Sequence, residues 1–140
     1  MNNVKDDFKI DFLDHVAIRV ADLQASILWY EKVLGLQKYQ LPEWGKFPVF
    51  MLAGKSGVAL FPISIDNQRT KPSPKNDTID HFAFNVSQTN FEKAKKRYQI
   101  LKLDFSIQDH HYFHSIYTKD PDGHTVELTT LVVNPEVFYK

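Results

Sequence analysis

The chain has 140 residues, of which 43% are hydrophobic and 24% charged, a balance typical of one globular domain with its own core. Basic and acidic residues both number 17, so no net charge favours nucleic acid or an anionic membrane, and a small molecule is the expected partner. Cysteine is absent, which excludes disulfides, thiolate metal sites and a cysteine nucleophile.

The apolar stretches are too short for a membrane helix. The longest, such as residues 49–53 and 58–63, fall far below the roughly 20 residues that cross a bilayer. The first seven residues contain no apolar core of a signal peptide. We therefore expect a cytoplasmic protein with no membrane contact.

The first half of the chain predicts a strand, a helix and three more strands. Apolar residues alternate with others over residues 14–20, as in a strand with one buried face. Asp22 is placed to cap a helix over residues 23–34, and Gly35 is placed to end it. Three short apolar runs follow and predict strands at residues 36–41, 49–53 and 58–63.

The second half repeats this pattern. The segment Asp14-His15-Val16-Ala17-Ile18-Arg19-Val20 returns as Asp80-His81-Phe82-Ala83-Phe84-Asn85-Val86, at an offset of 81 − 15 = 66 residues. Ser87 can cap a second helix, whose basic run over residues 93–97 is expected to be a solvated face rather than a nucleic-acid site. Strands are predicted at residues 104–108, 113–118 and 125–132.

The sequence thus predicts an α+β domain of two tandem βαβββ modules that form a curled mixed-sheet cleft. Module one covers about residues 11–65 and module two about residues 79–132. The polar segment at about residues 66–78 is interpreted as a linker or exposed loop. The tail, residues 133–140, is too short to predict an element, although its aromatic residues are candidates to cover a pocket or a partner subunit.

This tandem repeat, with a histidine on the first strand of each copy, resembles the vicinal oxygen chelate superfamily of glyoxalases, bleomycin-resistance proteins and extradiol dioxygenases. The resemblance covers about residues 11–132. It implies a cleft between two modules with a metal where they meet. It also implies a homodimer, in which the modules are either exchanged between subunits or not.

The resemblance further implies three metal ligands: His15, His81 and Glu127. The fourth position of the family pattern is Ala59, which cannot bind a metal. Two imidazoles and one carboxylate form a facial triad that leaves coordination positions open, and this set suits Fe(II) or Mn(II). The absence of a fourth ligand argues against glyoxalase I and the related epimerase.

The leading functional hypothesis is an extradiol-type dioxygenase. His110 and Tyr117, followed by the Asp-Pro-Asp-Gly turn and Glu127, are similar to the signature of those enzymes and are the candidate catalytic residues. An acid/base histidine of the dioxygenases is missing, because no histidine lies between Val16 and Asp80. Either His111 or His114 would have to replace it.

Two alternatives remain open. One is a fosfomycin-resistance-like transferase that adds a thiol or water to a small epoxide or phosphonate, with Ser115 and Tyr117 where those enzymes hold phosphonate oxygens. The other is a drug- or metabolite-binding protein of the bleomycin-resistance type, without turnover. The candidate substrate-binding residues are Ser115, Phe61 and His114.

Expectations also follow for Asp14, Asp80 and His124. Asp14 and Asp80 precede the histidine ligands, and neighbouring side chains on a strand point to opposite faces, so capping or turn hydrogen bonds are expected of them. His124 follows Gly123 in a turn and is expected to be exposed.

Overall fold

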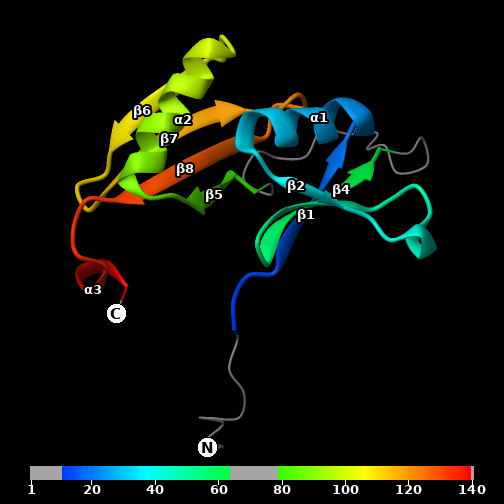
Figure 1. Ribbon diagram of the computed structural model, residues 1–140, viewed down its shortest axis with the longest axis horizontal. Coiled ribbons are helices and arrows are strands. Elements are labelled where there is room, and N and C mark those ends of the chain that lie inside the picture. Colours follow the sequence, from blue (N-terminus) through cyan, green and yellow to red (C-terminus); the bar gives the residue numbers. More distant parts are fainter. Residues whose placement is uncertain (1–10, 64–78, 140) are drawn as a thin grey trace, which may run out of the picture.

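The computed structural model describes residues 11–63 and 79–139, and each half of the chain folds as a βαβββ module (Figure 1). The first module comprises β1 (His15–Val20), α1 (Leu23–Leu34), β2 (Gln37–Tyr39), the 3-10 turn η1 (Pro42–Trp44), β3 (Val49–Ala53) and β4 (Ser56–Pro62). The second comprises β5 (His81–Asn85), α2 (Gln88–Ile100), β6 (Phe105–Asp109), β7 (Phe113–Lys119) and β8 (Thr125–Leu131), and α3 (Pro135–Phe138) follows it. The α+β class and the tandem modules are confirmed, while the interpretation of residues 66–78 as a linker lies outside the described residues.

Each module forms a mixed four-stranded sheet. The strand orders are β1-β4-β3-β2 and β5-β8-β7-β6, and the first and last strands of each module pair in parallel. The register places His15 opposite Gly57 in the first sheet and His81 opposite Thr125 in the second. The repeat in the sequence is therefore a repeat in topology and register.

Two short elements were not predicted. The tail forms the single-turn helix α3, because Asn134 accepts a hydrogen bond from the Glu136 amide and Pro135 occupies the first helical position. The turn η1 likewise begins with a proline, Pro42. Both were missed because an element of three or four residues has too few positions to show a periodic pattern.

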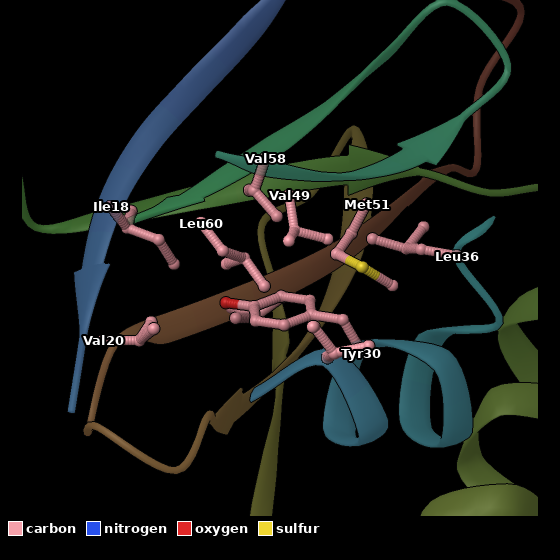
Figure 2. Close-up of a cluster of buried hydrophobic side chains, with 10 residues drawn as sticks. Ile18, Val20, Tyr30, Leu36, Val49, Met51, Val58 and Leu60 are labelled. Carbon is pink, nitrogen blue, oxygen red and sulfur yellow. The ribbon is translucent and has the colours of Figure 1, made fainter. Parts of the chain in front are cut away.

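The helices cover one face of each sheet. In the first module, alternate strand residues point at Tyr30 of α1, which is fully buried; Figure 2 shows Ile18, Val20, Val49, Met51, Val58 and Leu60 converging on it. Val126 of β8 joins the same cluster, with Phe82 and Phe84 of β5 packed against it. A second buried cluster, formed by Val33 of α1 with Phe91, Tyr98, Ile116 and Leu128, also joins the two modules, and the opposite face of each sheet is left open.

A turn of the second module accepts hydrogen bonds from the first module. The Tyr30 hydroxyl donates to Asp120 Oδ2 at 2.8 Å, and the Ala21 amide donates to Asp122 Oδ1 at 2.9 Å. His124 lies 2.8 Å from Asp120 Oδ2 through Nδ1 and is only partly exposed, so the expectation that it is exposed is wrong. Burial raises the pKa of the Asp120 carboxyl, but hydrogen bonds from His124 and Tyr30 outweigh it and hold the pKa below its ordinary value.

The second helix contains a tyrosine without this support. Tyr98 is fully buried against Phe105, with ring centroids 5.7 Å apart, and its hydroxyl has no hydrogen-bond partner among the described residues. Burial raises its pKa to about 12. An unsatisfied buried hydroxyl costs about 1–3 kcal/mol, whereas a hydrogen bond to a charged group contributes about 1.5–3 kcal/mol.

The two tyrosines should therefore respond in opposite ways to loss of the hydroxyl. We expect Tyr30→Phe to lower the free energy of unfolding by about 1.5–3 kcal/mol, because Asp120 loses a buried donor. Tyr98→Phe should leave that free energy unchanged or raise it by about 1 kcal/mol. Urea unfolding of both variants measures the difference, and equal losses in the two would contradict this account of the core.

Candidate metal centre

His81 and Glu127 meet on the open face of the second sheet. Parallel pairing of β5 with β8 places Ala83 opposite Glu127. His81 precedes Ala83 by two residues, so its side chain lies on the same face of the sheet as Glu127. His81 Nε2 lies 2.9 Å from Glu127 Oε1, and the His81 side chain is 37% exposed. One imidazole nitrogen and one carboxylate oxygen thus share a site that small molecules can reach.

The other ring nitrogen of His81 is held by its neighbour in sequence. Nδ1 lies 2.7 Å from Asp80 Oδ1, and Nδ1 of His15 lies 2.8 Å from Asp14 Oδ1 in the first module. Neither aspartate is placed as a ligand by these contacts, but each bonds the histidine that follows it, which is a different partner from the cap or turn amides expected. A carboxylate on Nδ1 directs Nε2 toward a ligand, as is usual for metal-bound histidines.

Glu127 is the most constrained of the candidate ligands. It is 4% exposed, and Oε2 accepts a hydrogen bond from the Ser115 hydroxyl at 2.5 Å. Among the described residues, no lysine or arginine forms a salt bridge with it. A carboxylate buried with neutral donors is costly unless a cation or a proton compensates the charge, so the donor set fits a divalent metal.

Tyr117 and His110 lie beside this pair. Tyr117 is opposite Glu127 in the β7–β8 register, and its hydroxyl lies 2.9 Å from His110 Nε2. Burial, and then the negative charge of Glu127, raise the pKa of the Tyr117 hydroxyl. The phenol therefore stays protonated at neutral pH and is available as a hydrogen-bond donor at the site.

His15 lies on the open face of the first sheet, apart from the other two candidate ligands. His15, His81 and Glu127 are not among the described residues whose ligand atoms gather within 4.8 Å of one another. Val16 and Ile18 of β1 line a small cavity together with His81. These two occupy the face of β1 opposite to His15, so one chain alone assembles two of the three expected ligands.

The predicted substrate-binding residues have different surroundings. Ser115 is fully buried and its hydroxyl is used by Glu127, so it positions the carboxylate. Phe61 lies on the open face of the first sheet, where Arg19 Cζ stacks 5.2 Å above its ring. His114 is opposite Thr130, on the face of β7 turned away from Glu127, and lies 3.6 Å from Asp109.

His111, which was considered with His114 as a replacement for the missing acid/base histidine, occupies the β6–β7 turn. Its φ of 71° is left-handed, and its amide donates to Asp109 Oδ1 at 2.8 Å. The residue is exposed, and no contact joins its side chain to Glu127 among the described residues. Of the three clustered histidines, His110 alone is brought to the open face beside Tyr117.

A second group of possible ligands lies in the turn between β7 and β8, which contacts the first module. Ligand atoms of Asp120, Asp122 and His124 lie within 4.8 Å of one another. Both oxygens of Asp120 already accept hydrogen bonds, from Tyr30, from His124 and from the amides of residues 122 and 124. This group is therefore explained as the contact that fixes α1 against the second module.

Sequence reasoning missed one cation on the open face of the first sheet. Arg19 follows His15 by four residues, so both side chains lie on the same face of β1. Its guanidinium donates to the Pro62 carbonyl at 3.1 Å and remains exposed. The alternation along residues 15, 17 and 19 was sufficient to find it.

Comparison with known proteins identifies the family of the chain. A family model for the Glyoxalase/Bleomycin resistance protein/Dioxygenase superfamily matches residues 12–128. The chain belongs to this superfamily. Solved structures support the same fold: a glyoxalase/dioxygenase from Nostoc punctiforme has a TM-score of 0.68 at 21% identity, covering 94% of both chains.

Enzymes of one branch of the superfamily are similar in sequence. Glutathione transferase FosA of Serratia marcescens is 30% identical over 83% of this chain and 78% of its own length. Metallothiol transferase FosB of Lysinibacillus sphaericus is 27% identical over 93% of this chain and 89% of its own. Fosfomycin resistance protein FosX of Mesorhizobium loti has a TM-score of 0.64 at 24% identity, covering 92% and 99% of the two chains.

These relatives change the order of the functional hypotheses. The leading expectation, an extradiol-type dioxygenase, receives no specific support from them, and the alternative of a fosfomycin-resistance-like thiol transferase fits better. The missing acid/base histidine is consistent with that order. Separately, none of the helices in the described part of the chain has the length and apolar character to span a membrane.

The contact between Asp80 and His81 gives a test of the metal assignment. We expect Asp80→Asn to weaken Mn(II) binding by about 10- to 100-fold, because the imidazole loses the carboxylate that orients it. Isothermal titration of Mn(II) measures the effect. Glu92→Gln, which removes an exposed carboxylate of α2, is the matched control, and an equal loss of affinity in both variants would refute an orienting role for Asp80.

Proposed function

We propose that this protein is a divalent-metal-dependent transferase of the fosfomycin-resistance type, which adds a thiol or water to a small epoxide that carries a phosphonate. The observation that carries the proposal is the pair His81 Nε2 and Glu127 Oε1, 2.9 Å apart on an open sheet face, with Tyr117 beside it. The similarity to FosA over 83% of the chain supports the same branch of the superfamily.

The ligands proposed are His81, Glu127 and, from a second copy of the chain, His15. Within one chain His15 lies on the far face of β1 from His81, so a homodimer with exchanged modules brings the third ligand to the pair. When bound, Mn(II) or Fe(II) at these residues supplies a Lewis acid for neighbouring substrate oxygens. Ser115 keeps the Glu127 carboxylate in place for it.

The reaction balances without an oxidant. The thiol sulfur, or a water oxygen, forms a bond to one epoxide carbon while the carbon–oxygen bond of the ring breaks. The nucleophile loses a proton and the ring oxygen gains one. Tyr117, whose raised pKa keeps it protonated, is placed to donate a hydrogen bond to that oxygen.

His110 supports Tyr117 in this role. Its Nε2 lies 2.9 Å from the phenol oxygen. When that nitrogen carries a proton, it donates to the phenol oxygen and leaves the phenol proton free for a substrate oxygen. Both residues that the dioxygenase hypothesis singled out are therefore retained, with a different substrate.

Product analysis tests the proposed reaction. We expect Mn(II)-loaded protein to convert fosfomycin in the presence of glutathione, another low-molecular-weight thiol, or water alone, with the adduct detected by nuclear magnetic resonance. Glu127→Gln should reduce the rate by at least about 100-fold, because a ligand and its charge are lost. Oxygen consumption with a catechol, and no fosfomycin conversion, would instead restore the dioxygenase hypothesis.

Mixing inactive variants tests the shared site. His15→Ala and His81→Ala should each abolish activity as homodimers. Co-expressed, they form mixed dimers in which one site receives both substitutions and the other receives none, so about half of the wild-type activity should return in each mixed dimer. Absence of any recovery, with mixed dimers shown to form, would mean that the three ligands come from a single chain.

A further inference from the structure

The tail helix α3 lies at the edge of the candidate metal centre. Phe138 packs against Phe113 of β7, with ring centroids 5.5 Å apart. Phe113 in turn lies 5.1 Å from the His110 ring, which contacts Tyr117. A row of aromatic contacts thus connects the tail to the site.

A cavity of about 210 Å³ lies between α3 and the open face of the second sheet. Glu127 and Thr129 form part of its floor, and its wall is largely apolar, with contributions from Phe113, Leu131, Phe138 and Tyr139. Glu127 is the one charged residue among the described residues that line it. The cavity therefore suits an uncharged, apolar group that lies next to the metal position.

The volume limits the size of that group. A cavity of about 150 Å³ holds one benzene molecule. The space beside Glu127 is therefore sufficient for one aromatic ring or a short branched aliphatic chain. Phe138 and Tyr139 are 43% and 58% exposed, so an apolar group in the cavity would also remove aromatic surface from water.

We propose that α3 forms the wall of a specificity subsite, in which Phe138 packs against an apolar substituent of the substrate, up to the size of one aromatic ring. This inference rests on the proposed function and extends it from the phosphonate to the group attached to it. Phe138 lines the cavity wall and is not one of the proposed metal ligands. Its role is therefore in ground-state binding and selectivity, and not in the chemical step. The preferred substrates are thus phosphonates larger than a methyl derivative.

Phosphonates of increasing size provide the test. Binding of methyl-, propyl- and phenylphosphonate to the Mn(II)-loaded protein is measured by isothermal titration. We expect wild-type protein to bind phenylphosphonate about tenfold more tightly than methylphosphonate, because the ring is buried against α3. Phe138→Ala should lose most of this preference while Mn(II) and methylphosphonate affinities stay unchanged.

Two further variants separate a binding role from a structural one. Phe138→Leu keeps an apolar wall and should restore most of the preference. Val137→Ala, on the same helix but not on the cavity wall, should behave as wild type. An unchanged preference in Phe138→Ala would overturn the subsite alone, whereas no Mn(II)-dependent binding of any phosphonate to wild type would overturn the proposed function together with it.

Discussion

The arrangement of this protein depends on one buried carboxylate in the middle of a sheet. Glu127 occupies the central strand pair of the second module at 4% exposure, where the matching residue of the first module is Ala59. An ionised carboxylate in such a place needs donors or a cation to offset the loss of hydration. Ser115 and His81 supply two contacts, and in the proposed function a divalent metal would compensate the rest of the charge.

Because of this difference, the two modules contribute different residues to the proposed centre. Both modules keep a histidine at the start of the first strand, with an aspartate on its Nδ1. In the first module, Ala59 pairs with Ala17 and Phe50, so the centre of that open face is apolar. The second module therefore provides the charged half of the proposed centre, and the first provides a single imidazole and an aromatic surface.

The buried contacts between the modules, including those of the Asp120 turn, determine which faces of the two sheets lie next to each other in one chain. Tyr30 and Asp120 join α1 to the second module through a buried hydrogen bond, and Val126 inserts into the core of the first. These contacts fix the modules with the helix-covered side of β1 next to His81. Because these contacts keep His15 apart from His81 within one chain, the proposed site needs His15 from a second chain.

The sequence by itself determined the module repeat, the order of strands and helices, and the face of each strand. Alternation with a period of two is a local property, and the offset of 66 residues between His15 and His81 made the repeat visible. The family resemblance singled out Glu127, Tyr117 and His110, and the observed strand register then placed Tyr117 opposite Glu127. The family pattern added the expectation of a metal, which no local rule supplies.

The tertiary structure alone decided which faces meet. Nothing in the spacing of residues indicates that Val16, and not His15, borders His81, because that depends on how two completed sheets pack. The turn of Asp14 and Asp80 back onto their histidines, and the fold of the tail over Glu127, depend on side-chain rotamers and on contacts between distant segments. Such contacts are set by packing around a common core, and sequence periodicity carries no information about them.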